Sequence, residues 1–167
     1  MYKVGKIIDS DILEEMAEEC LNENWSSGQS GVTGDELYSD VRTSKTFKCH
    51  RKFYPEFCEQ LEEWIGDGSK VNQINLLLYE KGSRFVKHED DIGDNVRHWS
   101  TSTILYLSDD YVGDGLRIYS GRDNKDFVVP RQEVGDTVIF SSKDTWHEAA
   151  PVERGTRIVA VAWLGFK

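Results

Sequence analysis

The stretch that decides the fold is the last apolar run of the chain, 156-TRIVAVAWLGF-166. It is rich in β-branched residues, which predicts a strand, and on a strand successive side chains point to opposite faces. One face would carry Arg157, Val159, Val161 and Trp163, and the other Ile158, Ala160, Ala162 and Leu164. Arg157 then faces an apolar interior. It must have an anionic partner there, because a buried unpaired charge is costly.

Similar short β-prone runs fill the chain upstream of this stretch, from residue 71 onward. Turns rich in Gly, Asp and Ser separate them, which is typical of an antiparallel sandwich or barrel-like roll. The predicted strands cover residues 73–79, 83–89, 100–108, 115–121, 126–130, 136–142 and 156–166. A jelly roll of this kind can hold a site in its mouth, where side chains from several strands converge.

Two amphipathic helices are predicted before the strands, so the fold class is α+β. In the first, residues 10–24, Asp11 and Glu14 have capping-box spacing. In the second, residues 55–68, Pro55 suits the first turn and Gly66 can end the helix. The expected apolar stripes are Ile12, Leu13, Met16, Ala17, Cys20 and Leu21 in the first helix, and Phe57, Leu61, Trp64 and Ile65 in the second.

The length of 167 residues predicts one domain, 1–167, with helical support and a loop in 1–70 and a catalytic β-roll in 71–167. A net charge of −10 disfavours nucleic-acid binding. The basic cluster of Lys45, Lys48, Arg51 and Lys52 is interpreted as a solvated face beside a helix. The three cysteines have no CxxC spacing, and no signal peptide or membrane span is evident, so we expect a cytoplasmic location.

The stretch 85-FVKHEDD-91 predicts half of a metal site. If it continues a strand, His88 and Asp90 point to one side, and Glu89 and Asp91 to the other. An imidazole and a carboxylate placed in this way can reach one metal ion. The pattern is short, however, and has a high false-positive risk, so a third ligand from another strand is needed.

Three histidines could supply the third ligand. His50 lies in the basic segment and is expected to be exposed, whereas His98 lies near His88 at a strand start and remains an alternative. His147 is favoured, because it lies between strand 136–142 and the final strand, where a residue from the far side of the roll would enter. Two histidines and one carboxylate form the facial triad of non-haem iron(II) oxygenases, which leaves three adjacent positions open.

The open positions suit a 2-oxo acid, which fills two of them and leaves the third for dioxygen. The distal carboxylate of such a cosubstrate needs a fixed cation, and a bidentate guanidinium is the best match. Arg157 lies ten residues after His147 and opens the final strand. We therefore expect Arg157 to anchor the cosubstrate.

Several segments, in this order, resemble the prolyl 4-hydroxylase branch of the 2-oxoglutarate/iron(II) dioxygenases over residues from about 39 to 166. They are YEKGSRFVKHED (79–90), TILYLS (103–108), GDGLRIY (113–119), VGDTVIF (134–140) and WHEAAPVERGTR (146–157), followed by a strand with Trp163. The chain has Phe85 where the family often has tyrosine, and it has Gly113-Asp114-Gly115 where the family has a Gly-Gly turn. Neither departure touches the predicted ligands.

The resemblance implies a double-stranded β-helix (jelly roll) with the N-terminal helices packed on one sheet. It also implies an Fe(II) site at His88, Asp90 and His147, with no catalytic residue beyond the metal site. Arg157 and Tyr106 would bind 2-oxoglutarate, with O2 as cosubstrate and ascorbate as reductant. Further pocket or substrate contacts would be Tyr79, Trp163, Arg42, Ser44 and Arg117. Core packing is an alternative for three of the aromatic residues, namely Tyr106, Tyr79 and Trp163. The loop at residues 25–46 is either a lid carrying Arg42 and Ser44 or a structural linker.

The implied reaction is hydroxylation of an aliphatic C–H bond, in a prolyl residue of a peptide or protein, with succinate and CO2 as coproducts. Alternatives are the same chemistry on a free amino acid or small metabolite, and a metal- or peptide-binding jelly-roll module without turnover. A cupin-like isomerase, or a dioxygenase that needs no oxo acid, is a third class. The sequence does not indicate an oligomeric state.

Overall fold

The computed structural model describes residues 1–22, 43–90 and 99–166. The N-terminal part contains β1 (Tyr2–Lys6), α1 (Ser10–Asn22), β2 (Lys45–Cys49), the 3-10 helix η1 (Arg51–Phe53) and α3 (Pro55–Ile65). The strands that follow are β3 (Lys70–Tyr79), β4 (Phe85–His88), β5 (Trp99–Tyr106), β6 (Tyr111–Val112), β7 (Leu116–Tyr119), β8 (Phe127–Val128), β9 (Asp136–Ser141), β10 (His147–Ala149), β11 (Arg154–Gly155) and β12 (Arg157–Gly165). Within these ranges, no helix has the length and apolar character needed to cross a bilayer.

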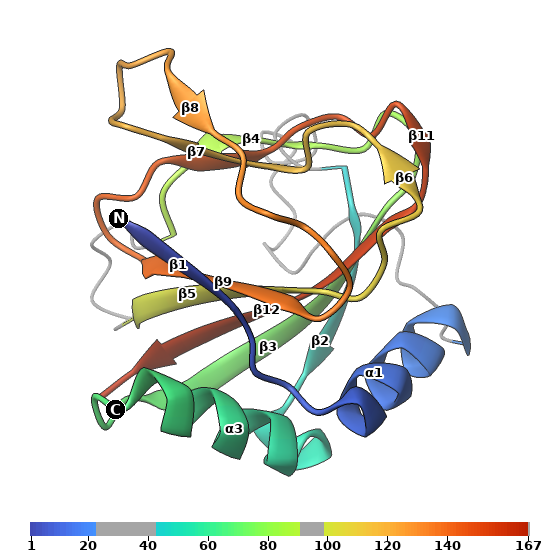
Figure 1. Ribbon diagram of the computed structural model, residues 1–167, viewed down its shortest axis with the longest axis vertical. Helices are drawn as coiled ribbons and strands as arrows, with labels where there is room; N and C mark the ends of the chain where they lie inside the picture. Colours follow the sequence, from blue (N-terminus) through green and yellow to red (C-terminus); the bar gives the residue numbers. More distant parts are fainter. Residues whose placement is uncertain (23–42, 91–98, 167) are drawn as a thin grey trace.

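Two antiparallel sheets form the roll. The large sheet has the order β1-β9-β5-β12-β3-β2, and the small one has the order β4-β10-β7-β8; β11 and β6 pair separately. Figure 1 shows α1 and α3 on one side of the large sheet and the small sheet on the opposite side. This arrangement confirms the predicted α+β double-stranded β-helix with its N-terminal helices packed on one sheet.

Strand β12 is central, and its two faces serve two different cores. It pairs with β3 on one side and β5 on the other. Ile158, Ala160, Ala162 and Leu164 pack into the cluster that includes the helices. Val159, Val161 and Trp163 pack into the cluster between the sheets. The alternation predicted from the sequence is therefore confirmed, and every residue of β12 is buried.

The first two strands, β1 and β2, were not predicted. Each lies at an edge of the large sheet. Both strands are short and contain lysines, so their sequences show only a weak alternation of apolar and polar residues. Of the predicted basic cluster, Lys45 and Lys48 lie on β2, and Arg51 and Lys52 lie on η1. Lys48 and Lys52 are exposed, as expected for a solvated face. Lys45 pairs with Glu80 at 3.1 Å across that edge.

Both predicted helices are present, with two local corrections. The first helix begins at Ser10, the first residue of the predicted range. The carbonyl of Asp9 accepts the amides of Ile12 and Leu13, so Asp11 lies within the first turn and does not cap the helix as its capping-box spacing predicted. In α3, Phe57 and Leu61 are buried as predicted. Trp64 is 36% exposed, because it lies over Gly5 of β1 rather than in the core stripe.

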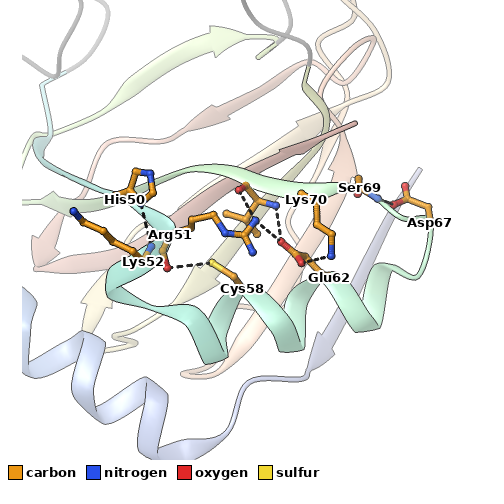
Figure 2. Close-up of polar contacts among 9 residues, drawn as sticks. His50, Arg51, Lys52, Cys58, Glu62, Asp67, Ser69 and Lys70 are labelled. Atoms are coloured by element: carbon orange, nitrogen blue, oxygen red, sulfur yellow. Dashed lines mark hydrogen bonds and ion pairs between the residues drawn. The ribbon is translucent and has the colours of Figure 1, made fainter. Parts of the chain in front are cut away.

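A buried carboxylate ties α3 to the sheet (Figure 2). The Glu62 side chain is 8% exposed and pairs with Arg51 at 3.0 Å and with Lys70 at 2.8 Å. It also accepts the backbone amide of Val71 at 2.9 Å, at the start of β3. Burial alone would raise the pKa of Glu62, but Lys70, the Val71 amide and Arg51 outweigh burial and hold the pKa below the ordinary value of 4.5.

We expect Glu62→Gln to lower the free energy of unfolding by about 1–2 kcal/mol at pH 7, because charge-assisted hydrogen bonds are replaced by neutral ones. A depressed carboxyl pKa stabilises the fold above the unfolded pKa, and this stabilisation is lost as the pH falls. The difference between wild type and variant should therefore shrink below about pH 4.5 in urea titrations. Glu63→Gln, at an exposed neighbour on the same helix, is the matched control. An equal loss in both variants would contradict this role of Glu62.

Candidate metal and cosubstrate site

Two histidines face each other across a strand pair of the small sheet. His147 on β10 is the register partner of His88 on β4, and their ring centroids are 4.2 Å apart. Phe85 stacks on His88 with ring centroids 3.7 Å apart, and Phe140 lies 4.6 Å from His147. The aromatic contacts and the strand pairing together fix the positions of both imidazoles.

The backbone orients both imidazoles in the same way. Nδ1 of His88 lies 2.7 Å from the carbonyl oxygen of Val86, and Nδ1 of His147 lies 3.0 Å from that of Thr145. A carbonyl can only accept, so each Nδ1 carries the proton and each Nε2 presents a lone pair. This is the usual arrangement of metal-ligating histidines.

The carboxylate of Asp90 completes the cluster, although not on a strand as predicted. β4 ends at His88, and Asp90 is held by its amide, which donates to the carbonyl of Ser142 at 3.1 Å. Its Oδ1 lies 3.3 Å from Nε2 of His88 and 3.6 Å from Nε2 of His147. The three ligand atoms lie within 4.8 Å of one another, a spacing that could hold one metal ion.

The protonation states suit a cation. Burial alone would raise the pKa of Asp90, but His147, His88 and a hydrogen bond from Ser102 hold the pKa well below its usual value. Burial lowers the pKa of His147 to about 4, with His88 adding to the effect and Asp90 opposing it. At pH 7 the cluster therefore offers an ionised carboxylate and a neutral His147 imidazole, the forms that bind metal.

Arg157 lies at the other end of the same cavity and is 1% exposed. Its guanidinium carbon lies 4.9 Å from the ring centre of Tyr79 and 5.5 Å from that of Tyr106. Within the described part of the chain, its Nε and Nη1 have no hydrogen-bond partner, and neither does the Tyr106 hydroxyl. Burial raises the pKa of Tyr106, so this hydroxyl keeps its proton and can donate it.

The cavity between the two sheets joins these groups. Its wall is mostly apolar, with the His–Asp cluster and Arg157 as the polar exceptions. Such a mostly apolar cavity with a few convergent polar groups is typical of a small-molecule site. The lining residues are Leu77, Tyr79, Phe85, His88, Asp90, Ile104, Leu116, His147, Ala149, Arg157, Val159, Val161 and Trp163.

The structure brings some of the remaining predicted residues to this cavity and places others elsewhere. Tyr79 and Trp163 line the cavity, and Tyr106 lies beside Arg157. Arg117 lies away from the cavity wall and pairs with Asp114 at 2.6 Å and Glu148 at 2.8 Å. Ser44 is fully buried just before β2. Arg42, His98, Asp91 and most of the predicted lid at 25–46 lie outside the described residues.

Two contacts to the Asp90 carboxylate were not predicted from the sequence. Ser102 donates to Oδ2 of Asp90 at 2.6 Å, and the indole Nε1 of Trp163, predicted only as a pocket-lining ring, donates to the same oxygen at 3.0 Å. Ser142 contacts Ser102 in turn. The alternation of side chains along the strand could have indicated Ser102. It shares a strand face with Ile104 and Tyr106, where a small polar residue is unexpected.

The fold and the site define an antiparallel jelly roll that presents two imidazoles, one carboxylate and a buried guanidinium to a single cavity. This is the class of non-haem metal oxygenases that use an oxo-acid cosubstrate. Residues 74–165 match the family model of the 2OG-Fe(II) oxygenase superfamily. The chain belongs to this superfamily.

The chain is also similar to individual relatives and to solved structures. A PKHD-type hydroxylase of Gloeothece citriformis is 30% identical over 99 residues, which are 57% of this chain and 43% of the relative. A second one, from Maricaulis maris, is 26% identical over 137 residues, which are 81% of this chain and 56% of the relative. The chain thus spans about half the length of the curated relatives it matches.

Two prolyl hydroxylase structures show the same fold. That of a Pseudomonas putida prolyl-4-hydroxylase has a TM-score of 0.75 and 16% identity, covering 99% of this chain and 92% of the other. That of a Trichoplax adhaerens prolyl hydroxylase, in complex with a hypoxia inducible factor oxygen degradation domain peptide fragment, has a TM-score of 0.76 and 15% identity. It covers 98% of this chain and 83% of the other.

A metal titration tests the cluster itself. We expect the protein to bind one Zn²⁺ or Co²⁺ per chain at pH 7 and to melt at a higher temperature with the ion, because an ion that binds only the folded state stabilises it. His88→Ala and Asp90→Ala should each remove the bound ion and the thermal shift. His50→Ala, at an exposed histidine, should leave both unchanged. Unaltered calorimetric binding in His88→Ala would contradict the assignment.

Proposed function

We propose that this chain is a 2-oxoglutarate- and Fe(II)-dependent dioxygenase that hydroxylates an aliphatic C–H bond in a prolyl residue of a peptide or protein. Fe(II) would be held by His88, Asp90 and His147. Arg157 and Tyr106 would bind the distal carboxylate of 2-oxoglutarate. Succinate and CO2 would be the coproducts, and ascorbate would keep the iron reduced.

The observation that carries the proposal is the buried guanidinium of Arg157. It shares a cavity with the His–Asp cluster, and no described residue forms an ion pair with it. A buried cation with unused donors requires an anion, because leaving it unpaired is costly. A dicarboxylate that chelates a metal at one end and presents a carboxylate at the other meets this requirement.

When bound, Fe(II) with 2-oxoglutarate and dioxygen supplies the oxidant that hydroxylates the substrate. The chain's own residues position the reactants and exclude water. Arg157 and the Tyr106 hydroxyl would fix the far end of the cosubstrate with charge-assisted hydrogen bonds. The apolar wall, which includes Leu77, Val159 and Val161, keeps the site dry, which strengthens these polar contacts.

The prolyl substrate is supported by the names of the relatives and by the side chains near the metal cluster. Both solved neighbours described above are prolyl hydroxylases, and one is in complex with a peptide fragment. In this chain, Phe85 stacks on His88 and Trp163 contacts Asp90, so both provide aromatic rings beside the cluster. A pyrrolidine ring is apolar and compact, and it suits such a surface.

Replacement of Arg157 tests the cosubstrate. We expect Arg157→Gln to raise the KM for 2-oxoglutarate by about 10- to 100-fold, because hydrogen bonds to a charged group contribute about 1.5–3 kcal/mol. Succinate formation in the presence of Fe(II) and ascorbate measures this change. Arg154→Gln, at an exposed arginine of β11, is the control. Succinate formation with an unchanged KM in Arg157→Gln would contradict the role of Arg157, whereas substrate oxidation in the absence of 2-oxoglutarate would indicate chemistry independent of an oxo acid.

A peptide library tests the substrate. We expect proline-containing peptides to gain the mass of one oxygen atom, together with stoichiometric succinate, whereas the same peptides with proline replaced by alanine do not. Free amino acids and small metabolites are screened in parallel. Oxidation of these compounds without oxidation of any peptide would contradict the peptide substrate and favour the metabolite alternative. Metal binding without any turnover of 2-oxoglutarate would contradict the enzymatic function.

A further inference from the structure

Asp90 is anchored to the large sheet, whereas the two histidines of the cluster belong to the small sheet. Its amide donates to Ser142 at the end of β9, and its Oδ2 accepts from Ser102 on β5 and Trp163 on β12. Oδ1 is the oxygen nearer to the histidine nitrogens. The two carboxylate oxygens therefore have different environments.

The direction of each hydrogen bond follows from counting protons. The ionised carboxylate of Asp90 can only accept hydrogen bonds. The Ser102 hydroxyl must therefore donate its single proton to Oδ2, at 2.6 Å. The Ser102 oxygen then accepts from the Ser142 hydroxyl, 2.8 Å away. Trp163 is a pure donor, at 3.0 Å. Oδ2 thus receives two hydrogen bonds, and one of their donors is polarised by a third group.

The donors are buried, and one of them is also stacked. Ser102 and Ser142 are fully buried, and Trp163 is 7% exposed. The indole of Trp163 stacks on Trp99 with ring centroids 4.7 Å apart and planes 17° apart, which fixes the direction of its N–H. Rotation of the carboxylate would leave a buried N–H or O–H without a partner, which costs free energy.

We propose that Ser102 and Trp163 are positioning residues that hold Asp90 so that only Oδ1 binds the metal. A carboxylate that binds through both oxygens takes two coordination positions. One that binds through a single oxygen leaves the third open position that a chelating oxo acid and dioxygen together require. This inference rests on the proposed metal site. It adds that residues of the large sheet control the metal affinity through their hydrogen bonds to Oδ2.

Two variants remove one donor each. Ser102→Ala deletes the hydroxyl, and Trp163→Phe keeps an aromatic ring but deletes the N–H. Each should weaken Zn²⁺ and Co²⁺ binding by about 10- to 100-fold, the range typical of residues that orient a metal ligand. Ser102→Thr, which keeps a hydroxyl, should restore affinity toward that of the wild type.

Matched controls remove the same chemical groups at positions that do not contact Asp90. Ser100→Ala removes a hydroxyl two residues away on β5, one that bonds the carbonyl of Leu164 and not Asp90. Trp64→Phe removes an indole N–H at an exposed site on α3. Both should bind metal with wild-type affinity.

A second measurement observes the wild-type protein directly. In wild-type protein, the indole N–H resonance of Trp163 should exchange slowly with solvent both without metal and with Zn²⁺, and Zn²⁺ should shift it. Trp163→Phe assigns the resonance by its loss. Rapid exchange in the Zn²⁺ complex, or Zn²⁺ and Co²⁺ affinities within twofold of wild type in both Ser102→Ala and Trp163→Phe, would overturn the inference. If wild-type protein binds neither ion, the proposed function fails instead.

Discussion

The two-faced strand β12 is the constraint on which the rest of the structure depends. One face must fill the core beneath α1 and α3, and the other must line the cavity between the sheets. Strict alternation achieves both, and it places Arg157 and Trp163 at opposite ends of the cavity-facing row. The same strand therefore carries both the buried guanidinium that is proposed to bind the cosubstrate and a hydrogen-bond donor to the Asp90 carboxylate.

The site is shared between the sheets. The small sheet contributes both imidazoles through one register pair, whereas the large sheet holds the carboxylate through Ser102, Ser142 and Trp163. A metal bound to all three ligands would link the two sheets across the cavity. Metal binding and the stability of the roll are then coupled, because the ion binds only when the sheets are correctly packed.

Much of this could be predicted from the sequence, for reasons that differ between residues. The strand alternation of β12 and the positions of His88, Asp90, His147 and Arg157 depend on local pattern and chain order, which the sequence contains. The edge strands β1 and β2 could not be predicted, because their short lysine-bearing segments become strands only by pairing with β9 and β3. Trp64 has the helical spacing of a core residue, but the approach of β1 left it partly exposed over Gly5.

The contacts of Asp90 were also beyond sequence reasoning, which placed it on a strand beside His88. It lies beyond the end of β4, and residues 12 and 73 positions downstream hold its side chain. Contacts at such separations depend on how the sheets close upon each other. Local periodicity cannot predict such contacts. The position of Ser102 on an inward-facing side of its strand was the one indication in the sequence.

We propose that the His–Asp cluster and Arg157 form one site that a metal and 2-oxoglutarate occupy together. Calorimetric titration of 2-oxoglutarate, under anaerobic conditions and with and without Fe(II), tests it most directly. We expect Fe(II) to tighten 2-oxoglutarate binding and 2-oxoglutarate to tighten Fe(II) binding by the same factor, as thermodynamic linkage requires. Equal 2-oxoglutarate affinity in the presence and absence of Fe(II) would contradict it.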